Sequence, residues 1–296
     1  MSEEPRAYTL LGTPRTAPRP EPALYLVATP IGNLSDITLR ALETIAGADR
    51  LACEDTRVTA KLLARFSIRR RMTAYHEHNA DEAGEALIAD LQAGLSVALV
   101  SDAGTPLVSD PGYRLASLAI ARGLKVVPVP GASAPLAALS ASGLPSDAFF
   151  FAGFLPQKAE ARRARLAELE RVPGTLLLFE APHRIAESLA AMADILGPRA
   201  AAVCRELTKA YETIYRGTLA ELAESFAAME RVRGEIVVCI APPAPEAAAS
   251  GEDADAILAG LLKEMKPASA AQEAARLTGL NRRDLYRRAL ALKDGG

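Results

Sequence analysis

A loop of small and polar residues follows an apolar segment in the first half of the chain. Val97 to Val100 is an unbroken apolar run typical of a buried parallel strand, and Ser101 to Gly112 continues it with Asp, Gly, Thr and Pro. Ligands of α/β folds bind beyond the carboxyl ends of the strands, where glycine lets the backbone approach them closely. The carboxylate of Asp102 suits a ligand hydroxyl or cation better than a phosphate. Ordinary turn chemistry, which favours the same residue types, is the alternative interpretation.

Two further loops have a similar composition. Thr29 to Asp36 follows the β-type run Leu24 to Ala28, and Pro130 to Pro135 follows Val126 to Val129. We expect these two loops and the loop after Val100 to lie at one edge of a sheet and to form a cleft. None of them matches G-x-G-x-x-G or G-x-x-x-x-G-K-[ST], so no motif supports binding of a dinucleotide or a nucleoside triphosphate.

The elements that must position these loops alternate between β-type and helical runs from Ala23 onward, which predicts an α/β fold. Thr213 to Tyr215 follows a strand too closely for an intervening helix, so the second sheet is expected to be mixed. The predicted organisation is a disordered tail (1–22), an N-terminal α/β domain (23–135), a C-terminal α/β domain (136–242), a linker (243–258) and a helix-turn-helix-like module (259–296).

Bulk properties limit the function classes. The 296 residues exceed one usual core, and a formal net charge of −2 provides no global attraction to nucleic acid. Cys53, Cys204 and Cys239 lack the spacing of a zinc site or a disulfide framework, which indicates free buried thiols. With no signal-peptide core and no apolar run of membrane-spanning length, the sequence predicts a cytoplasmic protein.

The C-terminal segment has a different character. Ala271, Ala274, Ala275 and Leu277 form one predicted helical face, and Asn281 is a predicted cap of the next helix. The stretch from Lys266 onward holds more basic than acidic residues, among them Arg282, Arg283 and Arg287. Contact with nucleic acid and a role as a bland cap or dimer element are both compatible with this pattern.

Several motifs, in consecutive order, resemble those of the tetrapyrrole methylase superfamily. Within that superfamily the chain looks like the branch that methylates a cytidine 2′-hydroxyl in small-subunit ribosomal RNA. Ala181 departs from the pattern, because the family often has Ser there. The matching segments are Leu24–Leu34, Ser101–Pro106, Pro130–Ala134, Gly153–Pro156, Glu180–Ile185, Cys204–Lys209 and Gly234–Val237.

The resemblance implies that S-adenosylmethionine binds between two α/β domains of a homodimeric enzyme. It also implies small-subunit (16S) ribosomal RNA as the substrate, in the assembled 30S particle. The residues that it places in cofactor-binding loops and strand ends are Pro30, Asp102, Thr105, Ser133, Ala134, Phe179 and Glu235.

Methyl transfer to a ribose hydroxyl needs an in-line approach and help with removal of the proton. Glu180, Glu206 and Lys209 are the predicted catalytic residues, with His183 a further candidate. A structural ion network of Arg205, Glu206 and Lys209 is the competing interpretation. The predicted RNA-binding residues are His183, Arg184, Arg205, Arg282, Arg283 and Arg287, and Arg162, Arg163 and Arg165 are possible extensions of that surface.

Two other functions remain open at this point. A methylase of corrin or sirohaem precursors would share the cofactor loops, whereas a non-enzymatic nucleic-acid-binding regulator would leave those loops unexplained. His76 and His78 flank Glu77, but no further ligand lies at metal-binding spacing, and no metal is expected.

Overall fold

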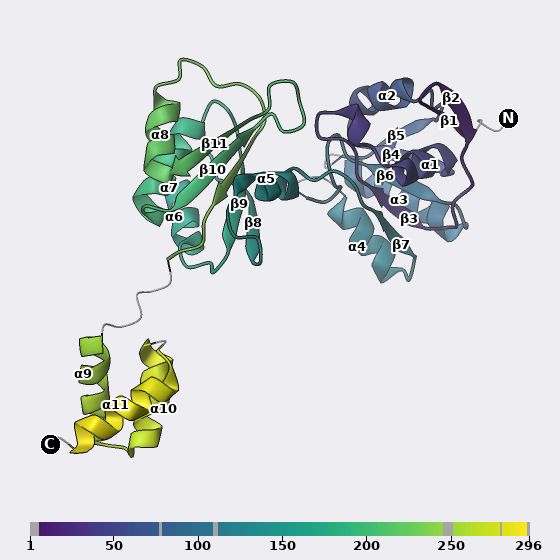
Figure 1. The fold of residues 1–296 in the computed structure, drawn as a ribbon. Coiled ribbons are helices and arrows are strands. Elements are labelled where there is room, and N and C mark those ends of the chain that lie inside the picture. The colour runs from purple at the N-terminus through teal and green to yellow at the C-terminus, as the bar shows by residue number, and fades with distance from the viewer. Residues whose placement is uncertain (1–5, 77–78, 109–111, 245–250, 279, 295–296) are drawn as a thin grey trace. The chain divides into compact units, whose positions relative to one another are not determined.

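The computed structural model describes residues 6–76, 79–108, 112–244, 251–278 and 280–294 (Figure 1). The chain divides into two compact units, Met1–Ala241 and Pro242–Gly296. The larger unit holds two α/β halves, each built on its own five-stranded sheet, as the sequence predicts.

The first half is a parallel sheet with the strand order β5-β4-β6-β3-β7. Leucines and alanines of α1 and α2 cover one face, and those of α3 and α4 cover the other. All residues of β6 are therefore buried, which explains its continuous apolar sequence. The bounds are β3 (Leu24–Val27), α1 (Leu39–Gly47), β4 (Arg50–Cys53), α2 (Thr56–Arg65), β5 (Met72–Ala74), α3 (Ala80–Gln92), β6 (Val97–Val100), α4 (Tyr113–Ala121) and β7 (Val126–Val129), with a 3-10 turn η1 (Leu34–Asp36).

The second half has the strand order β11-β10-β12-β9-β8 and is mixed, as predicted. β8 and β9 pair in parallel, β12 runs antiparallel to both β9 and β10, and β10 and β11 form an antiparallel hairpin. Helix α5 packs on one face of the sheet, while α6, α7 and α8 pack on the other. The bounds are α5 (Ala134–Ser142), β8 (Phe149–Phe154), α6 (Ala159–Leu169), β9 (Thr175–Glu180), α7 (Ile185–Leu196), β10 (Ala200–Arg205), β11 (Thr213–Thr218), α8 (Leu219–Ala227) and β12 (Ile236–Ile240).

The prediction of a disordered tail over residues 1–22 is wrong for its described part. β1 (Ala7–Leu10) and β2 (Thr13–Thr16) form an antiparallel hairpin, and Tyr8 is only 4% exposed in the core that α1 shares. The prolines misled the prediction, since Pro14 lies on a strand of a two-stranded sheet, where a missing N–H is tolerated.

Asp49 anchors this hairpin to the sheet. Its carboxylate accepts hydrogen bonds from Arg6 and Arg19 at 2.9 and 3.0 Å, and from the backbone N–H of Ser96 at 2.9 Å. Burial opposes ionisation of Asp49, but the bonds from Ser96 and Arg19 outweigh it and lower the pKa of the carboxyl group. The stabilisation is therefore present above the unfolded-state pKa and is lost as the pH falls through the lower folded-state value.

We expect Asp49→Ala to release the hairpin and to accelerate tryptic cleavage in the first 20 residues several-fold at pH 7, because Arg6 and Arg19 lose their hydrogen bonds to Asp49. Limited proteolysis with mapping of the cleavage sites measures this. Asp90→Ala, which removes the partner of the half-exposed Arg50, is the matched control. Equal cleavage rates in the two variants would show that Asp49 does not hold the hairpin.

The smaller unit consists of three helices around a small apolar core. The helices are α9 (Gly251–Leu262), α10 (Pro267–Thr278) and α11 (Arg282–Asp294). Since α9 begins at Gly251, the predicted linker to residue 258 is wrong in its second part. Ala271 and Ala274 are fully buried as predicted, but Leu277 is 54% exposed and does not belong to that face. Asn281 accepts a hydrogen bond from the N–H of Arg283 at 2.9 Å, which confirms the predicted cap.

Within the described part of the chain, no helix combines the length and the apolar character that a membrane span requires.

Candidate active site

The loops after β3 and β6 are hydrogen-bonded to each other. The N–H of Thr29 donates to the carbonyl of Gly104 at 2.9 Å, and the N–H of Gly104 donates back to the carbonyl of Thr29 at 3.0 Å. The hydroxyl of Thr29 also donates to the carbonyl of Ser101 at 3.1 Å. These bonds fix the two loops at the carboxyl edge of adjacent parallel strands.

The loop after β7 joins them through Thr105, whose hydroxyl donates to the carbonyl of Ala132 at 3.2 Å. Because β7 is the other neighbour of β3, the expectation that the three loops lie at one edge is confirmed. Residues 109–111 of the loop after β6 lie outside the described part of the structure.

The second half contributes three strand ends at one edge of its sheet. Ile236, the first residue of β12, pairs with Glu180 at the end of β9 and with Arg205 at the end of β10. The antiparallel course of β12 thus brings the segment before it, which contains Gly234 and Glu235, beside the ends of β9 and β10.

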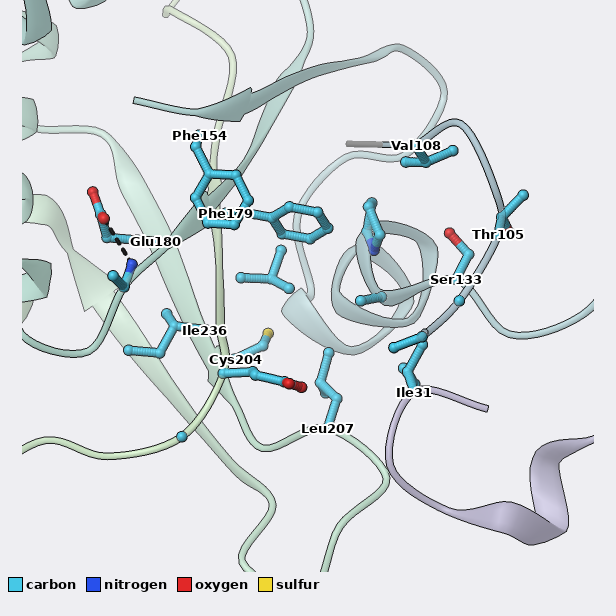
Figure 2. Close-up of a pocket in the computed structure, with 18 of the residues that line it drawn as sticks. Ile31, Thr105, Val108, Ser133, Phe154, Phe179, Glu180, Cys204, Leu207 and Ile236 are labelled. Atoms are coloured by element: carbon cyan, nitrogen blue, oxygen red, sulfur yellow. Dashed lines mark hydrogen bonds between the residues drawn. The ribbon is translucent and has the colours of Figure 1, made fainter. Parts of the chain in front are cut away.

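A cavity of about 350 Å³ lies between these loops and strand ends (Figure 2). This volume is within the usual range for small-molecule sites. Of the predicted cofactor residues, Thr105, Ser133, Ala134, Phe179 and Glu235 line the cavity, whereas Pro30 and Asp102 do not, although their neighbours Ile31 and Ala103 do. Apolar residues that carry no site signature in the sequence complete the lining: Ile31, Val108, Phe154, Cys204, Leu207 and Ile236.

Asp102 is half-buried next to the cavity lining, and its side chain is hydrogen-bonded to the segment that follows β4. Its carboxylate accepts a hydrogen bond from the N–H of Asp55, just before α2, at 3.0 Å. Burial raises the pKa of Asp102, and the negative charges of Glu54 and Asp55 add to this effect.

Lys209 forms the centre of a charged group at one side of the cavity. Its Nζ lies 2.8 Å from Oε1 of Glu206 and 2.9 Å from Oε2 of Glu235. Burial disfavours the ammonium charge, but the two carboxylates outweigh burial and raise the pKa of Lys209. The hydrogen bond from Lys209, helped by one from the N–H of Glu235, lowers the pKa of Glu206. Lys209 is therefore a cation at neutral pH and cannot be a general base.

Glycine is required where this group meets the backbone of the segment before β12. Gly234 has φ +92°, and a Cβ there would overlap the side chain of Glu206. A Cβ at Gly32 would likewise overlap the aliphatic stem of Lys209, so the loop after β3 lies directly against the charged group.

Glu180 also lines the cavity, but the hydrogen bonds of its carboxylate do not favour the predicted catalytic role. Its carboxylate accepts hydrogen bonds from the N–H of Ala181 at 2.7 Å, from Arg184 at 2.6 Å and from Ser188 at 2.5 Å. The side chain is fully buried and directed away from the cavity (Figure 2). Arg184, only 12% exposed, is bound to this carboxylate, which does not favour the predicted contact with RNA.

The other predicted RNA-binding residues lie in different parts of the structure. His183 is exposed and lines a second cavity, and Arg205 donates to the carbonyl of Arg233 at 3.0 Å. The competing ion network therefore consists of Glu206, Lys209 and Glu235, whereas Arg205 bonds to backbone. Arg282, Arg283 and Arg287 are exposed on α11 of the smaller unit, where Arg287 pairs with Asp284.

Helix α6 does not extend a basic surface. Arg162 is buried and pairs with Glu187, while Arg163 and Arg165 pair with Asp194 and Glu168. Each of these charges is locally compensated.

Among the described residues, no group of three or more His, Cys, Asp or Glu side chains could hold a metal ion. His78 lies outside the described residues, so the pair His76 and His78 has no structural test here.

Comparison with known proteins gives a consistent result. The family model of tetrapyrrole (corrin/porphyrin) methylases matches residues 23–223, and the model of the RsmI C-terminal HTH domain matches residues 248–293. "Ribosomal RNA small subunit methyltransferase I" of Mesorhizobium japonicum is 61% identical over 96% of this chain and 97% of its own. The protein of the same name from Pseudomonas aeruginosa is 50% identical over 90% of this chain and 96% of its own.

Solved structures share the fold of the larger unit. Uroporphyrin-III C-methyl transferase from Thermus thermophilus, complexed with S-adenyl homocysteine, aligns with a TM-score of 0.51 and 21% identity over 73% of this chain and 96% of that one. The α/β fold with a C-terminal helical module is thereby confirmed. The chain belongs to the tetrapyrrole methylase family and, within it, to the family of ribosomal RNA small subunit methyltransferase I.

Proposed function

We propose that this protein transfers the methyl group of S-adenosylmethionine to the 2′-hydroxyl of a cytidine in small-subunit ribosomal RNA. The observation that carries the proposal is the cavity whose lining combines three linked loops of one sheet with three strand ends of the other. Similarity to relatives named for small-subunit ribosomal RNA methylation supports the choice of substrate.

The cavity residues fit the cofactor. Ile31, Leu207 and Phe179 give apolar surface for an adenosyl group, and a small-molecule site of this kind needs only a few placed polar groups. Ser133 is the N-cap residue of α5, but its hydroxyl accepts no hydrogen bond from a backbone N–H of that helix, which leaves the hydroxyl available to a ligand.

S-adenosylmethionine, when bound, supplies a methyl group on a sulfonium. The chain must hold the ribose hydroxyl in line with that group and accept its hydrogen bond. Glu235 lines the cavity and is fixed by Lys209 at 2.9 Å, so we assign it as the acceptor that orients the hydroxyl. Glu206, with its lowered pKa, is a poor proton acceptor and fixes Lys209 and the N–H of Glu235.

The proposal also covers the RNA contacts, the form of the substrate, the oligomeric state and the cellular compartment. The exposed arginines of α11 provide phosphate contacts, the substrate is the assembled 30S particle, and the enzyme acts as a homodimer in the cytoplasm. A methylase of corrin or sirohaem precursors would not need the basic helical module, and a non-enzymatic regulator would not need the cavity.

The test is transfer of labelled methyl from S-adenosylmethionine to purified small ribosomal subunits, followed by mapping of the label to base or ribose. We expect label on one ribose. Absence of label on both subunits and naked ribosomal RNA, with the cofactor bound, would contradict the proposal and favour a small tetrapyrrole substrate.

Asp102→Asn is expected to weaken binding of the cofactor without lowering the stability of the fold. The amide oxygen can still accept the hydrogen bond from Asp55, and the substitution removes a charge that burial disfavours. Since a raised folded-state pKa means that the ionised carboxyl destabilises the fold at pH 7, we expect an unchanged or higher melting temperature. Asp102 does not line the cavity itself, but its proposed contact with the cofactor predicts an affinity for S-adenosylmethionine reduced about tenfold in Asp102→Asn by calorimetry, the scale of one charged hydrogen bond. Unchanged affinity would remove Asp102 from the proposed cofactor site.

A further inference from the structure

A second cavity, of about 530 Å³, adjoins the first and shares Pro182 and Gly234 with it. The proposed reaction gives this second cavity no role. Its lining includes the buried side chains of Ile185 and Phe226 together with half-buried Met229 and Val232. Met229 and Val232, which lie over the buried Ile185 and Phe226, provide a small apolar floor beside the proposed methyl-transfer site.

Two arginines lie at the rim of this floor. Arg231 and Arg233 are exposed, and within the described part of the chain neither has an ion-pair partner. This distinguishes them from Arg163 and Arg165 of α6, which are compensated by acids. Exposed His183 lies on the same rim, where Glu230 is the acidic residue.

The backbone that carries the two arginines is fixed on the side of the active site. Arg205 donates to the carbonyl of Arg233 at 3.0 Å, and the N–H of Glu235 donates to Glu206 at 3.0 Å. Gly234, between these contacts, lies against the side chain of Glu206. The position of Arg233 relative to the first cavity is therefore set by Arg205 and by Glu206, of which Glu206 also holds Lys209.

We propose that the second cavity binds the RNA nucleotide adjacent to the methylated one, with its base on the apolar floor and its phosphate at Arg231 and Arg233. Phosphate contacts from arginine position a nucleic acid, and single-stranded bases bind to apolar and aromatic surfaces. This inference rests on the proposed function and adds the residues that set the register of the strand. It requires the RNA to be single-stranded at the target, because a paired base could not reach the floor.

The experiment compares Arg231→Ala/Arg233→Ala with wild type and with Arg171→Ala, an exposed arginine that lines neither cavity. We expect the double variant to raise KM for small ribosomal subunits about tenfold or more, with kcat changed less and affinity for S-adenosylmethionine unchanged. Arg231→Lys/Arg233→Lys should restore part of the loss, because lysine still provides a positive charge.

Binding of ribosomal RNA as a function of salt gives a readout that does not depend on catalysis. Loss of two phosphate contacts should reduce the slope of log K against log salt by about 1.4, since each contact to a single strand contributes about 0.7. A slope and KM equal to those of Arg171→Ala would overturn the inference. Failure of wild type to methylate ribosomal RNA would instead contradict the proposed function, while the salt series would still report on the second cavity.

Discussion

Replacement of Lys209 by methionine is expected to lower the rate of methyl transfer about 100-fold. This factor is at the lower end of the rate effects that positioned acid and base side chains contribute. Methionine keeps most of the aliphatic stem that lies on Gly32 but removes the cation between Glu206 and Glu235. The two carboxylates then repel each other, the pKa of Glu206 returns toward its ordinary value, and Glu235 loses its fixed position. Single-turnover transfer to small subunits at saturating cofactor measures the effect.

Lys125→Met is the control for this prediction, because Lys125 forms an exposed ion pair with Glu21 outside the cavity lining. It should leave the rate unchanged. If Lys209→Met and Lys125→Met had the same rate, the charged group at the cavity would be a structural ion network without a part in the reaction.

Glu180→Ala is expected to lower the melting temperature by about 10 °C. The substitution leaves Arg184 buried without its carboxylate, and removal of one partner of a buried ion pair costs about 3–5 kcal/mol. For a domain of this size each kcal/mol corresponds to about 2–4 °C. Arg184 cannot find a replacement easily, since its Nη1 already has no hydrogen-bond partner. Thermal unfolding monitored by circular dichroism measures the change.

Glu168→Ala, which breaks an exposed pair with Arg165, is the matched control and should shift the melting temperature by less than about 3 °C. Adding Arg184→Met to Glu180→Ala should recover part of the loss, because the uncompensated charge disappears. A Glu180→Ala variant as stable as Glu168→Ala would return the carboxylate to consideration as a group that faces a ligand.

The sequence predicted the first cleft well because its signals are local. A continuous apolar strand requires a sheet covered on both faces, and the residues after such strands meet at one edge. The family resemblance then named Thr105, Ser133 and Ala134 within these loops, and all three line the cavity.

The direction of a charged side chain was not predictable in this way. Glu180 ends a strand that borders the cavity, but Arg184 and Ser188, near the start of α7, hold its carboxylate on the other side. Arg231 and Arg233 were missed because their proximity to the site depends on the antiparallel course of β12, which follows from pairing between distant segments. The N-terminal hairpin was not predictable because its two four-residue strands show no alternation and lie among prolines, although Tyr8 is buried.

The hydrogen bonds between Thr29, Gly104, Thr105 and Ala132 have a consequence for the affinity of the cofactor. Ordering a flexible loop around a ligand reduces the observed affinity by the entropy that the loop loses. Here most of that ordering is complete before a ligand arrives, because the loops immobilise one another when the sheet forms. A preorganised site of this kind should bind S-adenosylmethionine with little change in backbone exchange protection at these loops.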